Sequence, residues 1–420
     1  MQLPQDTDIL VIGGGIWGWS AAYHLAELGC ARQTLVLERN AEIVQETTSQ
    51  SAGQVGQLRG DAVLANAVGY TLELLAGFRE RTGHDPGFVR SGSLHVALCA
   101  ERAAMFARLA ETARGLGVVV EAVDHAEAAR LAPTLRLDDV HASLWVPRDG
   151  HVSAPATARA FANAARDAGV SLATGIEVVE LLVEHGRATG VRVIDHNGSA
   201  AEAKTIRAER IVLTAGPWTV LLAPTAGFSP PFFPIRLQQA RTESVGLPDS
   251  YPVLRVPDTS CYIRPERGGY LHGFFDPDPL PIDLHERGAA WRTRDVTPEP
   301  LLIAEMQRRL AGVLPQLAEL KIDEYRQGMI TCTPDGRFAI GAVPGVERLW
   351  MAGGCGGTGI AASGAIGRWL ANLAVNGHAG DDIGVYDPGR FAKQPEDKEW
   401  LRRSACQTSA AYYRLPSEVK

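Results

Sequence analysis

A chain of 420 residues, with 45% hydrophobic and 21% charged residues, is long enough for two domains and has the composition of a globular enzyme. Its formal net charge is −7 and it has no dense run of Lys and Arg, which argues against a nucleic-acid-binding protein. No apolar run reaches membrane-spanning length, and the six scattered cysteines have neither metal-ligand nor disulfide spacing. The sequence therefore predicts a cytoplasmic protein with no membrane span and no metal site.

The first forty residues contain the elements of a dinucleotide-binding unit. A short apolar run at 8–12 is typical of a buried parallel strand, and it leads into the glycine-rich run 13–18 (GGGIWG). A helical pattern over 20–28 and a second apolar strand at 34–37 follow, and Glu38 ends that strand. This order of strand, turn, helix, strand and acid predicts a site for the ADP half of a dinucleotide.

Each of the three fingerprint glycines has a separate task. We expect Gly13 to form the tight turn, Gly15 to let the backbone approach the pyrophosphate, and Gly18 to let helix and strand pack closely. The free N–H groups and the positive dipole end of the helix then face the phosphates. Glu38 is placed to bind the ribose hydroxyls, and an acid there would repel a 2′-phosphate, so NADP is not expected.

Apolar periodicity and short apolar runs predict the next elements of the chain. In chain order they are a helix over 61–82, a strand at 93–98, a helix over 156–168, a strand at 170–173, an antiparallel meander over 176–213, a separate antiparallel sheet within 230–290 with strands near 241–245, 261–264 and 270–275, and a helical stretch over 297–320 that Pro315 breaks or kinks.

A second glycine-rich turn follows the last predicted strand, 348–352. It covers 353–359 (GGCGGTG) and leads into a predicted helix from 360 to about 376. A helix N-terminus that a cofactor approaches closely can stabilise negative charge, and a reduced flavin carries such charge. The turn is therefore either a second contact with the same cofactor or a tight packing turn in the core.

These motifs together resemble the D-amino-acid-oxidase-like FAD enzymes, which include glycine oxidase, monomeric sarcosine oxidase, and the sarcosine and dimethylglycine dehydrogenases. The resemblance spans nearly the whole chain and rests on VIGGGI (11–16), LER (37–39), DGHV (149–152), TAGPW (214–218), TPDG (333–336) and the turn 353–360. The sequence is most similar to the dehydrogenase branch, on SAGQVGQLR (51–59), TGIAASG (358–364), RF (390–391) and YYRLP (412–416). In that branch the last segment leads into a folate-binding domain, which we do not expect here because the chain stops at Lys420.

The resemblance implies an α/β fold in which a Rossmann-like FAD-binding domain is interleaved with a substrate domain that carries an antiparallel sheet. We expect three FAD-binding segments, two substrate segments and a C-terminal tail. The FAD-binding segments are 1–90, 151–228 and 323–385. The substrate segments are 91–150 and 229–322, and the tail is 386–420.

The implied reaction is oxidation of the C–N bond of an amino acid or N-alkyl amino acid. Hydride passes to flavin N5 and the resulting imine hydrolyses, with oxygen or another electron acceptor completing the cycle. A D-amino-acid or glycine oxidase or dehydrogenase is an alternative within the same class. A flavin subunit of a multi-protein amine dehydrogenase complex is an alternative of another class, so the partner is either a second copy of the chain or a different subunit.

The residues that match the family's FAD-binding positions are the expected FAD contacts. They are Gly13, Gly15, Ile16, Trp17, Gly18, Glu38, Arg39, Ser49, Gln50, Ala52, Gly53, Val178, Ala215, Gly216, Trp218, Gly328, Gly354, Gly356, Gly357, Thr358, Gly359 and Ile360. Some relatives tether the flavin through a histidine that matches Gln50 or a cysteine that matches Gly328. Neither residue can form that bond, and Cys332 and Cys355 lie near but at other positions, so we expect noncovalent FAD.

Three residues are candidates for substrate contact. Arg59 matches the carboxylate-binding arginine of monomeric sarcosine oxidase, and a guanidinium fork suits a planar carboxylate. Alternation places Tyr262 and Arg264 on one face of a strand, either toward the substrate or as a core aromatic and a structural ion pair. Leu237 and Gln239 stand where the dimethylglycine branch has a histidine and a tyrosine. Because leucine cannot transfer a proton, we expect either the substrate or the way its amine is deprotonated to differ from that branch.

Overall fold

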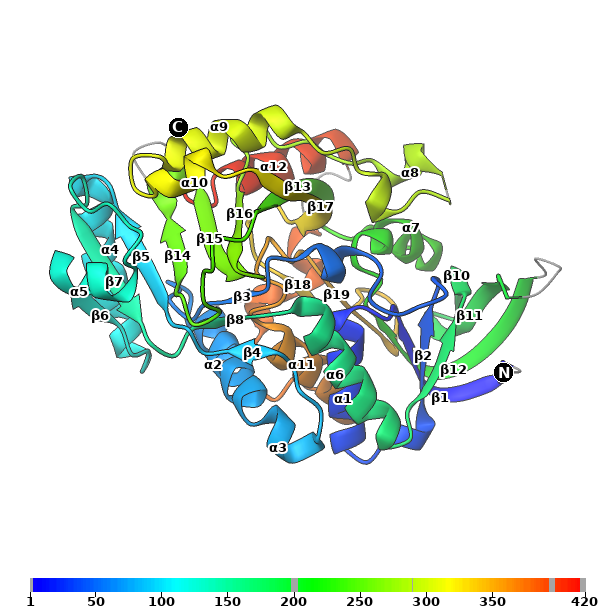
Figure 1. Cartoon of the computed structure of the whole chain (residues 1–420). Coiled ribbons are helices and arrows are strands. Elements are labelled where there is room, and N and C mark those ends of the chain that lie inside the picture. Colours follow the sequence, from blue (N-terminus) through cyan, green and yellow to red (C-terminus); the bar gives the residue numbers. More distant parts are fainter. Residues whose placement is uncertain (1–2, 198–202, 289, 393–396, 416–420) are drawn as a thin grey trace.

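The computed structural model describes residues 3–197, 203–288, 290–392 and 397–415. It contains two eight-stranded sheets, each built from segments far apart in the sequence (Figure 1). A small three-stranded sheet lies near the middle of the molecule and consists of β3 (Gln54–Val55), β8 (Gly150–Val152) and β4 (Phe88–Val89). The α/β fold class with two interleaved sheets is confirmed.

The first sheet contains the predicted dinucleotide-binding unit. Its strand order is β10 (Ile176–Glu184), β11 (Arg187–Asp195), β12 (Ala203–Leu213), β1 (Asp6–Ile12), β2 (Thr34–Glu38) and β9 (Ser171–Thr174), with β19 (Leu349–Gly353) also paired to β12 and β18 (Ala339–Ala342) paired to β19. The pairs β1–β2, β1–β12, β2–β9 and β12–β19 are parallel, whereas β10, β11 and the first half of β12 form the predicted antiparallel meander.

Both faces of this sheet are covered. The helix α1 (Ile16–Glu27) packs against α6 (Ala154–Asp167) and α11 (Ser363–Asn376), and Ile9 and Val11 of β1 pack in the same apolar cluster. The alternate residues Leu10 and Ile12 belong to a second cluster on the other face. Burial on both faces explains why β1 is a continuous apolar run rather than an alternating one.

The second sheet is mostly antiparallel. Its order is β17 (Ile322–Cys332), β13 (Phe233–Thr242), β16 (Gly269–Phe274), β15 (Cys261–Glu266), β14 (Val253–Val256), β5 (Ser93–Ala97), β7 (Ala142–Val146) and β6 (Glu121–Val123). The helices around it are α9 (Pro300–Leu310), α10 (Pro315–Glu319), α4 (Ala100–Gly115), α5 (His125–Leu131) and α12 (Lys398–Ala410). The remaining helices of the described chain are α2 (Ala62–Ala76), α3 (Phe78–Thr82), α7 (Thr219–Leu222) and α8 (Leu284–Arg287).

The two faces of the second sheet have different surroundings. Ile263 packs in a cluster with Ile303 and Leu310 of α9, which covers one face. Tyr262, its neighbour on β15, packs instead with Phe275 and Ile330. Since side chains alternate along a strand, Tyr262 faces away from α9. This second face carries the substrate candidates.

Several sequence-based bounds need correction. The strand expected at 241–245 is β13, which ends at Thr242, and its alternation is hidden because polar Gln238 and Gln239 are buried in it. The stretch 297–320 contains two helices rather than one, with the break before Pro315 as predicted. The helix expected from 360 begins at Ser363 because the turn continues to that point.

Sheet membership also moves one predicted boundary. The third FAD segment was expected to begin at 323, but β17 pairs with β13 along the second sheet as far as Cys332. The predicted tail, 386–420, contains α12, and its residues 393–396 and 416–420 lie outside the described part of the chain.

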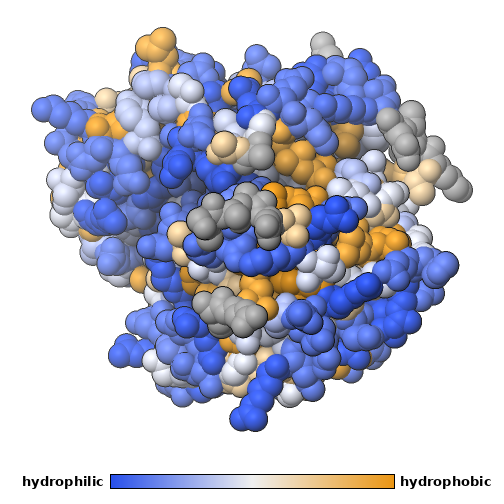
Figure 2. Space-filling model, turned by 90° about the vertical axis from the view of Figure 1, so that its right-hand side faces the viewer, coloured by the Kyte–Doolittle hydropathy of each residue, from blue (hydrophilic) through white to orange (hydrophobic). Residues whose placement is uncertain are grey.

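The surface has mixed character. Figure 2 shows a face on which hydrophilic residues dominate and hydrophobic ones gather near the middle. Among the helices of the described residues, none is both long enough and apolar enough to cross a bilayer.

Candidate active site

A cavity lies at the carboxyl ends of β1, β2 and β12, where parallel strands of an α/β sheet place their ligands. Its wall includes Ile12, Leu37 and Thr214 from these strand ends. The second sheet contributes Tyr262 from β15 and Gly328 from β17 to the same cavity. Both domains therefore meet around one space.

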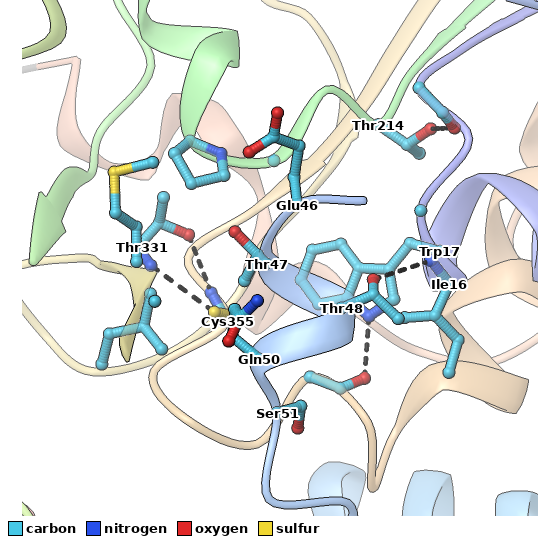
Figure 3. Close-up of a pocket in the computed structure, with 18 of the residues that line it drawn as sticks. Ile16, Trp17, Glu46, Thr47, Thr48, Gln50, Ser51, Thr214, Thr331 and Cys355 are labelled. Carbon is cyan, nitrogen blue, oxygen red and sulfur yellow. Dashed lines mark hydrogen bonds between the residues drawn. The ribbon is translucent and has the colours of Figure 1, made fainter. Parts of the chain in front are cut away.

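The first glycine turn forms one end of this cavity. Gly13 has a φ of +109°, and a Cβ built on it would lie 2.5 Å from the Thr214 carbonyl oxygen. A Cβ on Gly18 would lie 2.0 Å from the Gly13 oxygen, so both positions require glycine for the protein's own packing. The Thr48 hydroxyl accepts a hydrogen bond from the Ile16 N–H at 3.1 Å (Figure 3).

Gly15 differs from these two glycines. It is the N-cap of α1, with a φ of −82° that any residue adopts and no capping side chain of its own. A Cβ built on it would meet only the Thr48 hydroxyl, at 3.4 Å, which is ordinary contact. The protein alone does not require glycine here, whereas an anion at the helix N-terminus would.

Acidic and aromatic side chains line the rest of this end. The Glu38 carboxylate accepts hydrogen bonds from the N–H groups of Gly14 at 2.9 Å and Asn40 at 2.8 Å, and burial raises the pKa of Glu38. The Arg39 guanidinium lies 3.9 Å from the centroid of the Trp218 ring and is held by Glu46 at 3.0 Å. The polar groups of this wall, which also includes Val178, can hydrogen-bond a ribose.

The two glycine turns are joined directly. The Trp17 indole N–H donates a hydrogen bond to the Gly359 carbonyl at 2.8 Å (Figure 3). Within the second turn, the Thr331 hydroxyl accepts from the N–H groups of Gly354 at 2.9 Å and Cys355 at 3.1 Å. Turns that lie more than 300 residues apart therefore border one cavity, which favours contact with two parts of one cofactor over the alternative of a simple packing turn.

The two positions that match the relatives' flavin tethers are neighbours. A Cβ built on Gly328 would lie 2.9 Å from Gln50 Cβ, and both residues line the cavity. The Gln50 carbonyl accepts a hydrogen bond from the Gln239 amide, so β13 fixes this segment. Cys355 lines the cavity, whereas Cys332 is buried outside its wall, where burial raises the pKa of its thiol.

Buried polar atoms on the wall show that the site fits a polar, extended ligand. Thr47 Oγ1, Gln54 Nε2, Arg59 Nε and Gln239 Oε1 are buried without a hydrogen-bond partner in the described structure. Unpaired buried groups are costly, so a molecule bound in the cavity would stabilise these four atoms by supplying hydrogen-bond partners. Together with the open space at Gly15 and the N-terminus of α1, these atoms fit FAD.

The substrate candidates lie on the same wall as the second glycine turn. Arg59, Tyr262, Leu237 and Gln239 all line the cavity. Tyr262 is buried, and burial raises the pKa of its phenol, so the hydroxyl stays protonated at neutral pH and can donate or accept a hydrogen bond. Leu237 and Gln239, which stand where the dimethylglycine branch has a histidine and a tyrosine, line this part of the cavity.

Five predicted residues lie outside the cavity wall. These are Gly18, Ser49, Gly354, Gly356 and Arg264. Gly18 serves helix packing, as expected, and the Ser49 hydroxyl donates to the Glu46 carbonyl at 2.7 Å. Arg264 pairs with Glu266 at 2.9 Å and donates to the Ala52 carbonyl, so in this structure its side chain supports the wall from behind.

Sequence reasoning missed several residues of the wall. They are Glu46, Thr47, Thr48, Arg255, Phe275, Thr331 and Tyr412. Thr48 lies two residues before Gln50, which the family match had placed at the flavin. The polar residues next to Gln50 could therefore have been predicted as cofactor contacts. Tyr412 belongs to the segment 412–416 that resembles the dehydrogenase branch, but nothing in that match placed it at the cavity. Arg255 reaches the cavity only through tertiary packing and carries no local signal.

Comparison with known proteins identifies the family. Residues 8–373 match the family model described as "DAO: FAD dependent oxidoreductase". The chain belongs to this family. FAD is the cofactor of its members, in agreement with the residues above.

Individual relatives agree with the predicted branch. The chain is 30% identical to 4-methylaminobutanoate oxidase (formaldehyde-forming) from Paenarthrobacter nicotinovorans, over 95% of this chain and 47% of that protein. It is 28% identical to mitochondrial dimethylglycine dehydrogenase from Rattus norvegicus, over 92% of this chain and 45% of that protein. It thus spans about half the length of these relatives. The solved structure of L-proline dehydrogenase from P. horikoshii has a TM-score of 0.81 and 25% identity, over 93% of this chain and 99% of that one.

Noncovalent binding of FAD has a direct test. Because Gln50 and Gly328 stand at the tether positions, acid precipitation of the purified holoprotein should release all yellow flavin into the supernatant. Flavin absorbance in the washed pellet would contradict this expectation. Cys355→Ala is the control that shows whether a cysteine on the cavity wall holds any retained flavin.

Proposed function

We propose that this chain oxidises the C–N bond of an amino acid or N-alkyl amino acid. When bound, FAD accepts a hydride from the carbon next to the amine nitrogen, which leaves an imine that water hydrolyses. The observation that carries the proposal is the position of Arg59. Its guanidinium lines the same cavity as the second glycine turn, where it can bind a substrate carboxylate while the amine end faces the flavin.

The wall around Arg59 supports an amine with a small apolar part. Leu237 and Phe275 are apolar, and the Tyr262 hydroxyl is a donor that can orient the substrate. Since Leu237 and Gln239 cannot accept a proton at neutral pH, the substrate amine must enter as its free base or lose its proton to water. The relatives 4-methylaminobutanoate oxidase and dimethylglycine dehydrogenase support a secondary or tertiary amine as the substrate.

The cellular setting is also a proposal. All six cysteines are free thiols, which supports a reducing compartment such as the cytoplasm. The electron acceptor in this proposal is either oxygen or a dedicated acceptor. The proposed assembly is either a homo-oligomer or a complex with a partner subunit.

The test is an anaerobic screen. The holoprotein is mixed with a panel of glycine, sarcosine, dimethylglycine, proline and 4-methylaminobutanoate, and we expect at least one carboxylated amine to bleach the flavin absorbance. Bleaching only after a co-purified partner is added would favour a flavin subunit of a complex. Peroxide formation in air, compared with reduction of a dye, then separates oxidase from dehydrogenase.

A further inference from the structure

A second arginine lies on the substrate wall. Arg255 on β14 is the cross-strand partner of Tyr262 on β15 and lines the cavity. It is only 6% exposed. In the part of the chain that the structure describes, neither Arg255 nor Arg59 forms an ion pair with a carboxylate, and Arg59 Nε has no partner. A buried guanidinium that lacks an ion partner is unusual unless a ligand supplies it.

The C-terminal tail holds both guanidinium groups. The Tyr413 hydroxyl accepts a hydrogen bond from Arg255 Nη1 at 2.8 Å, and the Tyr412 hydroxyl accepts one from Arg59 Nη1 at 3.4 Å. The Tyr412 ring is stacked on Phe275, with centroids 3.7 Å apart and an interplanar angle of 5°.

A buried arginine on α4 anchors this tail. Arg102 Nη2 donates to the Tyr413 carbonyl at 2.5 Å, and the same side chain pairs with Asp258 at 3.1 Å. Arg102 is 2% exposed, so this contact is screened from water. The two tyrosines are therefore fixed rather than loosely placed, and they can set the directions of the arginines.

The charges near the two arginines leave room for one anion. Asp149 is buried, with its carboxylate oxygens held by the Gln57 N–H at 2.8 Å and the Ser93 hydroxyl at 2.5 Å. Burial raises the pKa of Asp149 to about 6, so it is ionised above that pH, while burial lowers the pKa of His95 and keeps it neutral. Two guanidinium groups and one carboxylate leave one net positive charge.

We propose that Arg59 and Arg255 together bind the single carboxylate of the substrate, and that Tyr412 and Tyr413 hold the two arginines in place. This inference rests on the proposed function and extends it to a residue that the family resemblance did not indicate. Arg255 is a binding residue, whereas Tyr413 is a positioning residue that acts through it. The ligand class of this site is therefore an amine that carries a carboxylate.

The test is an equilibrium titration of the holoprotein that needs no turnover. The probes are pyrrole-2-carboxylate and pyrrole-2-carboxamide, and the readout is the change of the flavin spectrum. We expect the wild type to prefer the acid. Arg255→Gln should raise the Kd of the acid about 10- to 100-fold and that of the amide less than about threefold. Arg241→Gln is the matched control, because Arg241 lies on the same sheet but pairs with Asp323 and Glu324.

Two milder variants keep the test valid if Arg255→Gln does not fold. Arg255→Lys retains the charge without the fork and should give an intermediate Kd for the acid. Tyr413→Phe should raise the acid's Kd about three- to tenfold and KM for a carboxylated substrate, with kcat unchanged. Equal weakening of acid and amide, or no acid preference in the wild type, would overturn the two-arginine site. Failure of every amine to reduce the wild-type flavin would instead overturn the proposed function.

Discussion

Replacing Gly15 with alanine should leave the protein folded and remove most of its affinity for FAD. The backbone at Gly15 has an ordinary φ of −82°, and an added Cβ would meet only the Thr48 hydroxyl at 3.4 Å. The methyl group would, however, occupy the space through which the helix N-terminus reaches the pyrophosphate. Overpacking of this kind costs about 1–3 kcal/mol, which corresponds to a loss of affinity of about 5- to 150-fold.

Two other glycines give the matched comparison. Gly18→Ala should destabilise the folded protein itself, because its Cβ would lie 2.0 Å from the Gly13 carbonyl oxygen. Gly115→Ala, at the end of α4 with no atom within 4 Å, should change neither stability nor FAD binding appreciably. Thermal unfolding of the apoprotein and a fluorescence titration with FAD separate the two effects. Wild-type affinity in Gly15→Ala would show that the pyrophosphate does not lie at this turn.

The FAD end was predictable because its signals are local. The first strand, turn, helix and acid lie within forty residues, and each has a steric or electrostatic reason that can be read from residue type alone. Gly13 and Glu38 therefore lie where the fingerprint placed them. The second glycine turn added long-range information, since the Trp17–Gly359 hydrogen bond joins it to the first.

The substrate end was less predictable because its residues are brought together by the fold. Arg264 shares a face with Tyr262, as alternation predicted, but the nearby Glu266 holds it in an ion pair. Arg255 lies on β14, a strand that the sequence analysis did not predict, and its burial beside the cavity depends on β5 and β15 on either side. Tyr412 comes from a segment about 140 residues later that packs back onto Phe275.

Replacing Arg59 with alanine should impair a carboxylated substrate far more than its uncharged amide. A hydrogen-bonded ionic contact contributes about 1.5–3 kcal/mol, so KM for the acid should rise about 10- to 100-fold. The amide cannot form the ionic contact in either protein, so its KM should change only a few-fold. Steady-state kinetics with a matched acid and amide pair, chosen from the anaerobic screen, measures both values.

Arg59→Lys distinguishes charge from geometry. Lysine retains the positive charge but offers a point donor instead of a planar fork, and it also loses the contact from Arg59 Nη1 to the Tyr412 hydroxyl. If both arginines share one carboxylate, KM for the acid in Arg59→Lys should lie between the values of the wild type and of Arg59→Ala, because Arg255 still supplies the second contact. Equal losses for acid and amide in Arg59→Ala would mean that Arg59 only supports the wall. The carboxylate would then have to bind elsewhere, and Arg255 would be the remaining unpaired cation on that wall.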